Sequence, residues 1–121
     1  MTASPHTIGA EQNIELASKR MNDLGIRHLP VLKGGKLVGI ISDRDIRLVE
    51  ALESVDPGLI LVQDVMSPEI YSVSPDASMA QVCAHMAKQK FGSAVIVEKE
   101  VIVGIFTTID ALRAFSDHLL K

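Results

Sequence analysis

The fold is decided by Gly39-Ile40-Ile41-Ser42-Asp43-Arg44-Asp45, where an apolar strand runs into the start of a charged helix. A second stretch, Gly104-Ile105-Phe106-Thr107-Thr108-Ile109-Asp110, has the same order of residue types. Each begins with glycine, continues with two apolar residues and a hydroxyl residue, and places an aspartate three positions after the hydroxyl. We expect the function of the protein at or beside these two strand-to-helix corners.

The two corners belong to a repeat that covers nearly the whole chain. A shift of 65 positions places Gly39 on Gly104 and Asp45 on Asp110 without a gap. Self-similarity at one fixed spacing indicates two copies of one structural unit. We therefore assign residues 1–58 to the first repeat and residues 59–121 to a connector and the second repeat. The same shift also pairs Met1 with Met66, Ile8 with Val73, Met21 with Met86, Val38 with Val103 and Ser42 with Thr107.

Each repeat is expected to form a strand, a helix, two strands and a second helix. Apolar residues at spacings of three and four indicate the helices, and Gly25 is typical of a helix C-cap. In the first repeat we expect strands at 7–8, 28–32 and 37–41, a turn at 33–36, and helices at 14–24 and 43–54. In the second we expect strands at 69–73, 93–97 and 101–107, a helix capped around Ser74-Pro75-Asp76, and a last helix at 108–120.

These elements predict an α/β (α+β) fold of two β-α-β-β-α repeats. A unit of about 60 residues cannot bury both faces of its sheet alone. We therefore expect the repeats to pack sheet against sheet about a pseudo-twofold axis, with the two corners flanking a cleft. The connector at 59–66 begins with four apolar residues and is expected to pack against the core.

Composition restricts the class of protein. The chain has 121 residues and a net charge of -3, which gives no electrostatic reason to expect nucleic acid as a partner. No apolar run approaches the ~18 residues of a membrane span, and the N-terminus lacks a signal-peptide layout, so a cytoplasmic location is the default. The mean hydropathy of +0.25 is a hint that another chain covers some apolar surface.

Helix capping alone would account for the residues of the corners. A serine or threonine before a helix accepts a hydrogen bond from a backbone N–H one turn in, and a carboxylate three residues later reaches back. Ser42 with Asp45, and Thr107 with Asp110, have this spacing. Capping contributes about 1 kcal/mol per helix without any ligand.

The same geometry can bind a nucleotide. A helix N-terminus attracts phosphate, a nearby hydroxyl can donate to it, and a carboxylate can accept two hydrogen bonds from a ribose diol. Gly39 and Gly104 have no side chain, so that another backbone or a planar base can approach closely. Capping and adenosine-phosphate binding therefore both remain open.

The residues around the corners carry a family resemblance. The segments that carry it are Gly25–Val31, Leu37–Asp45, Asp64–Pro68, Val73–Asp76, Phe91–Val95 and Val103–Asp110. With these segments the chain resembles a tandem pair of cystathionine-β-synthase-type (CBS) domains, a Bateman module, over essentially its whole length. Met1-Thr2 matches Met66-Ser67, which predicts that the chain begins at the start of the motif, with little room for an N-terminal effector domain.

The resemblance implies a regulatory module that binds AMP, ADP, ATP or S-adenosylmethionine between its repeats. It implies that Asp45 and Asp110 hold the ribose diol, with Ser42 and Thr107 near ribose and phosphate. It also implies association into a homodimer through the helices, and an unknown downstream effector protein. The adenine slot is implied at Thr7, Ile8 and Leu29 in one repeat and at Ser72, Val73, Ser93 and Ala94 in the other.

The two repeats differ at one point of this pattern. Arg27 and His28 match a basic pair that approaches the phosphates of the nucleotide held by the partner repeat. The second repeat has Gly92 and Ser93 there. We therefore expect the Thr107/Asp110 site to have the better phosphate environment.

Other functions find less support in the sequence. The order Asp43-Arg44-Asp45 resembles a metal-binding pair, but successive helical residues do not converge on one cation. Cys83 lies on the apolar face of its helix and is expected to be a buried structural thiol. No catalytic set is visible, so we expect no enzyme and no metal. The alternative to a sensor is a ligand-free structural or dimerisation module whose corners are only helix caps.

Overall fold

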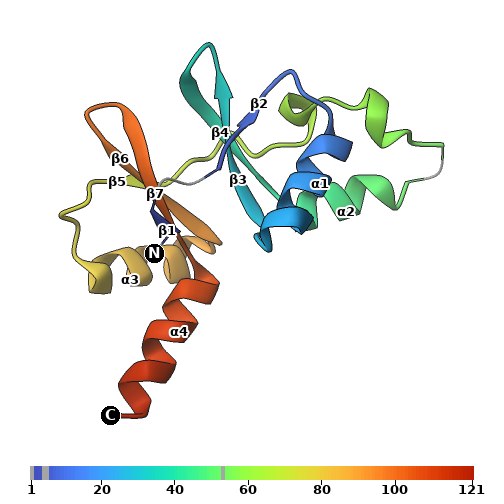
Figure 1. Ribbon diagram of the computed structural model, residues 1–121. Helices are drawn as coiled ribbons and strands as arrows, with labels where there is room; N and C mark the ends of the chain where they lie inside the picture. Colours follow the sequence, from blue (N-terminus) through green and yellow to red (C-terminus); the bar gives the residue numbers. More distant parts are fainter. Residues whose placement is uncertain (1, 4–5, 53) are drawn as a thin grey trace. The chain divides into compact units, whose positions relative to one another are not determined.

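The computed structural model describes residues 2–3, 6–52 and 54–121 (Figure 1). The chain forms two compact units. The first-repeat unit comprises residues 6–70, and the second-repeat unit comprises residues 71–121 together with the N-terminal strand β1 (Thr2–Ala3). Among the described helices, none is long and apolar enough to cross a membrane.

The first-repeat unit is a three-stranded sheet covered by two helices. Strands β2 (Ile8–Gly9) and β3 (His28–Lys33) are parallel, and β4 (Lys36–Ser42) is antiparallel to β3. Helix α1 (Ile14–Leu24) connects β2 to β3, and α2 (Asp43–Glu50) follows β4 directly. The core contains Ile14, Ala17 and Met21 from α1, Leu29 and Val31 from β3, Ile41 from β4 and Ile46 from α2.

The second-repeat unit repeats this arrangement and adds one strand. Its sheet has the order β1-β7-β6-β5, formed by β5 (Ser72–Val73), β6 (Ser93–Glu98) and β7 (Val101–Thr107) with β1. Helix α3 (Met79–Gln89) precedes β6, and α4 (Thr108–Leu119) follows β7. Its core is formed by Val82, Met86, Ala94, Ile96 and Phe106.

The strand registers show how closely the repeats agree. The hairpin β3-β4 shifts register between Val31 and Leu32, and the hairpin β6-β7 shifts between Ile96 and Val97, 65 positions later. Outside the hairpins, Ser67 forms a bridge with Ile40, and its repeat equivalent Thr2 pairs with Ile105. Thus Ser67, which precedes the strands and helices of the second repeat, adds to the sheet of the first-repeat unit. In the same way Thr2, which precedes those of the first repeat, adds to the sheet of the second-repeat unit. The sequence division at residue 58 remains a prediction, distinct from these spatial units.

Four local expectations needed correction. The strand expected at 69–73 is shorter and comprises only β5 (Ser72–Val73). Helix α2 ends at Glu50, earlier than expected, and is followed by a short 3-10 helix at Pro57–Leu59. Helix α3 begins at Met79 with Ser78 as its N-cap, because residues 75–76 form a turn in place of the predicted cap. Strand β1 was not predicted, since a two-residue segment carries no periodicity and depends on its partner strand.

The connector packs as expected. A second short 3-10 helix, Val62–Asp64, places Val62 in the core of the first-repeat unit with no solvent exposure. The backbone N–H of Val62 donates to the carbonyl of Gln12 at 2.7 Å, and that of Ile14 donates to the carbonyl of Ile60 at 2.9 Å. These bonds fix the connector against the start of α1.

Candidate functional site

The first corner is a capping box at the start of α2. Ser42 is the N-cap, and its Oγ accepts a hydrogen bond from the backbone N–H of Asp45 at 3.1 Å. The backbone N–H of Ser42 donates to Oδ2 of Asp45 at 3.2 Å. Both side chains are half-buried. The capping interpretation of this serine and aspartate is therefore confirmed, and it leaves ligand binding untested.

The second corner has the same hydrogen bonds at the start of α4. Thr107 Oγ1 accepts from the backbone N–H of Asp110 at 3.3 Å, and the backbone N–H of Thr107 donates to Asp110 Oδ2 at 2.9 Å. One contact has no equivalent in the first corner: the hydroxyl of Thr107 is also placed to donate to Asp110 Oδ2, at 3.2 Å. Internal hydrogen bonding is therefore more extensive at the second corner.

The backbone N–H groups at each helix start are mostly used within the corner. The N–H of Asp43 donates to the carbonyl of Arg27 at 2.9 Å, and that of Thr108 donates to the carbonyl of Gly92 at 3.2 Å. Among the described residues, no acceptor contacts the N–H of the second helical residue, Arg44 or Ile109. Each corner thus retains one backbone donor that could meet a phosphate or sugar oxygen.

The side chains of the first corner retain further hydrogen-bonding capacity. Oδ2 of Asp45 closes the capping box, and no donor in the described part of the chain contacts its Oδ1. The Ser42 hydroxyl accepts in the box and keeps its own proton for another acceptor. A half-buried carboxylate oxygen, a hydroxyl proton and a helical N–H therefore lie together at one point of the surface.

His28 and Ser93 occupy equivalent positions beside the corners. His28 pairs with Ser42 across the β3-β4 hairpin, and Ser93 pairs with Thr107 across β6-β7. Burial lowers the pKa of His28 below its usual value, the carboxylate of Asp45 opposes this shift, and Arg27 adds to it. His28 is therefore mainly neutral at neutral pH and can donate or accept one hydrogen bond at each ring nitrogen.

Arg27 has a partner within its own unit. Its Nη1 lies 3.4 Å from Oδ2 of Asp43, and Nε of Arg47 lies 2.8 Å from the same oxygen. The Arg27 side chain is 70% exposed, so water screens its pair with Asp43. The family resemblance predicts that Arg27 approaches a phosphate. To do so, Arg27 would have to break only its weak ion pair with Asp43.

The predicted adenine-slot residues lie on β2, β3, β5 and β6 or directly before β2, with different burial. Thr7 and Val73 are half-buried, Ser72 is exposed, and Ile8, Leu29 and Ala94 are buried. Leu29 packs in the core of the first-repeat unit and Ala94 in that of the second. Their side chains therefore have structural roles as well, and the ligand contacts of all these residues remain predictions.

Another part of the backbone approaches Gly39 closely, which is one of the two possibilities that the sequence predicted. A Cβ at this position would lie 2.5 Å from Sδ of Met66 and 2.8 Å from the carbonyl oxygen of Ser67. Backbone hydrogen bonds of 2.9 and 2.8 Å connect Ile40 and Ser67 beside it. The backbone that approaches this glycine is therefore the chain's own connector.

Comparison with known proteins identifies the family. The model of the family described as CBS domain matches residues 1–51 and 62–117. The chain belongs to the CBS-domain family. Its two matched segments make it a tandem CBS pair, or Bateman module, in agreement with the internal repeat.

Two relatives define how far this similarity extends. The CBS domain-containing protein YhcV of Bacillus subtilis is 32% identical over 105 residues, which are 87% of this chain and 74% of YhcV. Inosine-5'-monophosphate dehydrogenase of Korarchaeum cryptofilum is also 32% identical over 105 residues, covering 86% of this chain. The match covers only 21% of the dehydrogenase. The similarity thus concerns one module of that enzyme.

Solved structures confirm the CBS-pair fold. A Vibrio cholerae protein named for acetoin utilization (AcuB) is 32% identical, with a TM-score of 0.83 and coverage of 98% of this chain and 88% of that one. The CBS domain pair of protein MJ0100, solved in complex with 5-methylthioadenosine and S-adenosyl-L-methionine, is 26% identical. Its TM-score is 0.83, with coverage of 97% of this chain and 93% of that one.

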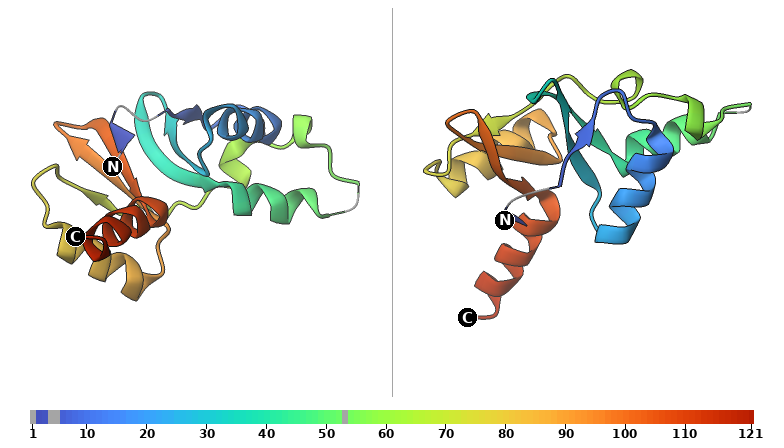
Figure 2. Two further views of the ribbon diagram at one scale, coloured as in Figure 1. Left: turned by 60° about the horizontal axis from the view of Figure 1, so that its bottom comes forward. Right: turned by 45° about the horizontal axis from the view of Figure 1, so that its top comes forward.

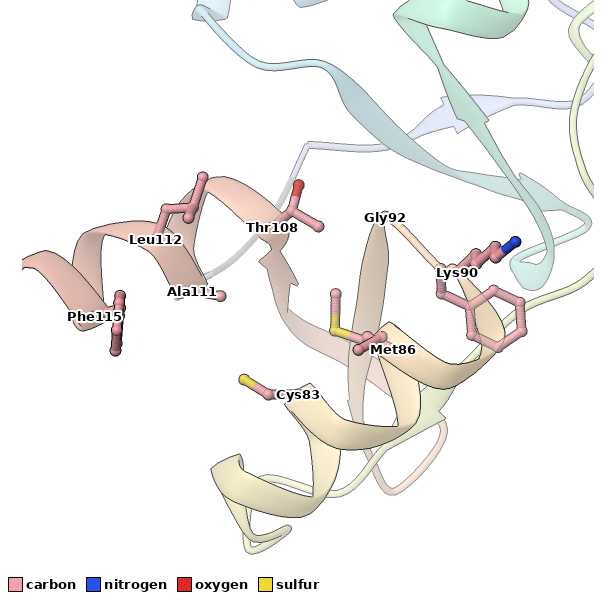
Figure 3. A pocket seen from close by; sticks show the side chains of 10 residues that line it. Cys83, Met86, Lys90, Gly92, Thr108, Ala111, Leu112 and Phe115 are labelled. Atoms are coloured by element: carbon pink, nitrogen blue, oxygen red, sulfur yellow. The ribbon is translucent and has the colours of Figure 1, made fainter.

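The described part of the chain contains no group of three or more histidine, cysteine, aspartate or glutamate side chains placed to hold a metal ion. Cys83 is a free thiol and is half-buried, whereas the sequence predicted a buried one. It lines an open groove between α3 and α4 (Figure 3). From the sequence, Cys83 was placed on the apolar face of its helix, and periodicity does not reveal whether such a face is covered.

Proposed function

We propose that this protein is a regulatory module that senses an adenosine-type ligand, namely AMP, ADP, ATP or S-adenosylmethionine. The observation that carries the proposal is the hydroxyl-aspartate pair, present with the same backbone geometry at both corners of a tandem CBS pair. The 26% identical CBS pair of MJ0100, solved with two adenosyl compounds, supports this ligand class.

In this proposal, Asp45 binds ribose with the part of its carboxylate that capping does not use. Oδ2 stays with the backbone N–H of Ser42, while Oδ1 accepts from the ribose hydroxyls. The Ser42 hydroxyl and the N–H of Arg44 donate to a sugar or phosphate oxygen. Capping and ligand binding are then complementary, because the capping box holds the carboxylate in one orientation before the ligand arrives.

Asp110 and Thr107 have the same roles at the second corner. Without ligand, the Thr107 hydroxyl is placed to donate to Asp110 Oδ2. When the ligand binds, this hydroxyl rotates and donates to the ligand instead. The guanidinium of Arg27 and a hydrogen bond from the neutral imidazole of His28 serve the phosphates of the nucleotide at this site. The sites are thus unequal, and the Thr107/Asp110 site prefers the more highly phosphorylated ligand.

Binding has a regulatory outcome in this proposal, without catalysis. Ligand binding stabilises one arrangement of the module, and a homodimer transmits that arrangement to an effector protein. The second candidate function is a ligand-free structural or dimerisation module. The completed capping boxes favour it, because they explain the serine, the threonine and both aspartates as helix starts.

A thermal-shift panel with AMP, ADP, ATP, S-adenosylmethionine and NAD separates these functions. A ligand at about 100 times its dissociation constant stabilises the fold by about 2.7 kcal/mol, which raises the melting temperature by several degrees. Absence of a shift with every adenosine ligand at millimolar concentration would contradict the sensing function.

Two variants identify the corner as the site. Asp110→Ala removes the cap and the ribose acceptor, and we expect it to lower the melting temperature and abolish the response of its site. Ser78→Ala is the matched control, because Ser78 caps α3 through a 3.4 Å hydrogen bond from the N–H of Gln81, outside the proposed site. It lowers the melting temperature by a similar amount and leaves the ligand-induced shift unchanged. An equal ligand-induced shift in both variants would assign Asp110 to capping alone.

A further inference from the structure

The strand that opens each repeat is paired differently in the two units. In the second repeat the parallel pairing of β5 with β6 begins at Ser72 and Val95. In the first repeat the pairing of β2 with β3 begins at Ile8 and Val31, one residue later than the repeat equivalent. Strand β2 lies at the edge of its sheet, beside β3 (Figures 1 and 2). The beginning of the first repeat thus has one backbone pair fewer than that of the second.

A proline accounts for the missing pair. In the second repeat the backbone N–H of Val95 donates to the carbonyl of Tyr71 at 2.8 Å. The equivalent residues, 65 positions earlier, are Pro30 and His6. Because proline has no backbone N–H, Pro30 cannot donate to the His6 carbonyl. No other donor in the described part of the chain contacts this carbonyl. The first repeat therefore retains a backbone acceptor that the second repeat uses within its sheet.

The side chain of Arg20 anchors the same segment of the first repeat. Its Nη1 donates to the carbonyl of Thr7, 13 positions earlier in the chain, and both residues are half-buried. The repeat partner of Arg20 is His85, whose ring centroid lies 4.3 Å from that of Tyr71. An arginine hydrogen bond thus fixes the residue that follows His6, whereas a backbone hydrogen bond and ring packing fix Tyr71.

We propose that the His6 carbonyl accepts a hydrogen bond from the amino group of adenine, and that Arg20 is a positioning residue for this carbonyl. The inference rests on the proposed function, in which Thr7, the next residue, lines the adenine slot of the site at the first corner. It specifies the ligand of that site as a nucleotide whose purine carries an amino group where hypoxanthine and guanine carry an oxygen.

The chemistry of the bases explains why a carbonyl can select adenine. The amino group of adenine is a donor, and the corresponding oxygen of hypoxanthine or guanine is an acceptor. A carbonyl only accepts, so it binds the amino group and repels the oxygen. The Thr7 hydroxyl can donate or accept and therefore cannot make this distinction. Since the other slot side chains of the first repeat, Ile8 and Leu29, are apolar and buried, the backbone has to read the edge of the base.

The anchor is needed because a carbonyl selects a base only when its direction is fixed. A mobile peptide unit could rotate and present its N–H in place of its C=O, and would then bind either kind of purine. The hydrogen bond from Arg20 fixes the peptide unit after Thr7 and thereby restricts the preceding unit, which carries the His6 carbonyl. Fixing this unit before the ligand arrives lowers the entropy cost of binding.

The two sites are expected to differ in base selectivity. The Tyr71 carbonyl already accepts from Val95, so it is a poorer acceptor for a bound purine. AMP and IMP differ in the amino group and the oxygen, and share the ribose and the phosphate. We expect AMP to bind the site at the first corner about tenfold more tightly than IMP, because IMP leaves the His6 carbonyl opposite another acceptor. At the second corner the two affinities should agree within about twofold.

Isothermal titration calorimetry with AMP and IMP tests this on the full chain. Asp110→Ala leaves the site at the first corner, and Asp45→Ala leaves the site at the second. The decisive change is Pro30→Val in the Asp110→Ala background, because it introduces the residue that the second repeat has there, with its N–H. We expect a folded protein whose preference for AMP falls from about tenfold to about twofold. An unchanged preference in a folded variant would overturn the inference.

Arg20→Met tests the anchor in the same background. It keeps an unbranched side chain without a donor, so AMP should bind about fivefold more weakly and the preference over IMP should decrease. Arg20→Lys retains a donor and should restore part of both. Gln12→Met is the matched control, because Gln12 Oε1 accepts from the N–H of Gly9 at 2.8 Å on the same edge strand. It should leave the preference unchanged, and an equal decrease in both methionine variants would assign Arg20 to stability alone.

The outcomes also separate this inference from the proposed function. Equal binding of AMP and IMP in the Asp110→Ala background would overturn the reading of the base and leave nucleotide sensing intact. Binding of AMP in the Asp45→Ala background alone would do the same, with sensing confined to the second corner. Absence of AMP binding in both backgrounds and in the wild-type chain would overturn both.

Discussion

The first and second repeats form the same capped strand-to-helix corner, but the side chains next to the corner differ between them. Both corners close a capping box, and in both the first helical N–H donates to the carbonyl of the residue before the central strand. Around this common frame, His28 stands opposite Ser42, whereas Ser93 stands opposite Thr107. The backbone hydrogen bonds thus define the corner, and the neighbouring side chains can diversify without disturbing it.

The grooves between α1 and α2 and between α3 and α4 also combine an equivalent backbone with different side chains. Equivalent backbone positions carry Arg47 and Glu50 in one repeat and Leu112 and Phe115 in the other. The two repeats therefore carry equivalent surfaces with different side chains, one charged and the other apolar. Four measurements test how far the two repeats are equivalent.

The largest effect is expected from Gly39→Ala. Its Cβ would meet both Met66 and the Ser67 carbonyl at distances that require a backbone shift, so the free energy of unfolding should fall by about 3 kcal/mol. Urea denaturation measures this. Adding Met66→Ala should restore only part of the loss, because the 2.8 Å approach to the Ser67 carbonyl remains. A change below about 0.5 kcal/mol would mean that the connector does not pack there.

A smaller and opposite pair of effects is expected at the ends of α1 and α3. Gly25 and its repeat partner Lys90 both end their helices in the left-handed conformation, with φ of 66° and 61°. Since a side chain makes this conformation costly, Lys90→Gly should stabilise the fold by about 1 kcal/mol and Gly25→Lys should destabilise it by about 1 kcal/mol. Thermal denaturation of both variants checks the signs. Two changes of the same sign would refute the equivalence of these caps.

A pH-dependent difference is expected between His28 and its partner position. Burial lowers the pKa of folded His28, so the unfolded chain binds more protons than the folded chain as the pH falls through about 6.5. His28 therefore supports stability above this pH and loses that contribution at lower pH. The variant His28→Ser copies Ser93 and should flatten the pH dependence of unfolding between about pH 7.5 and 5.5. Identical pH profiles of wild type and variant would contradict this assignment.

The smallest effect on stability is expected from Asp43→Thr, which copies Thr108. The exposed Arg27 pair contributes little, so the free energy of unfolding should change by less than about 1 kcal/mol. The variant frees Arg27, however, and under the proposed function it should increase the thermal shift with ATP more than that with adenosine. Equal changes for the two ligands would show that Arg27 does not approach the phosphates.

Most of the fold could be predicted because its signals are local. The apolar spacing of α1, the glycine that ends it and the hairpin turn each depend on a few consecutive residues. One prediction failed where two local patterns compete. Helix α3 begins at Met79 with Ser78 as its N-cap, because residues 75–76 form a turn, although Ser74 also has the composition of a cap.

The candidate site, like the fold, could be predicted where the signal lies within a few consecutive residues. The pairs Ser42/Asp45 and Thr107/Asp110 were found from their spacing, and their hydrogen bonds are those of a capping box. The interaction of Arg27 with Asp43 was not foreseen, because the two residues are 16 positions apart and meet only when β3 and β4 pair.

The duplication, the order of elements and the two capped corners follow from the sequence, since hydrogen-bond spacing and periodicity are properties of short segments. Three features follow from the folded chain instead: the connector packs on Gly39, β1 completes the second sheet, and the groove between α3 and α4 is an open apolar face. Each depends on burial or steric contact between residues that lie far apart in the chain. No local pattern can state which of two equivalent surfaces will remain uncovered.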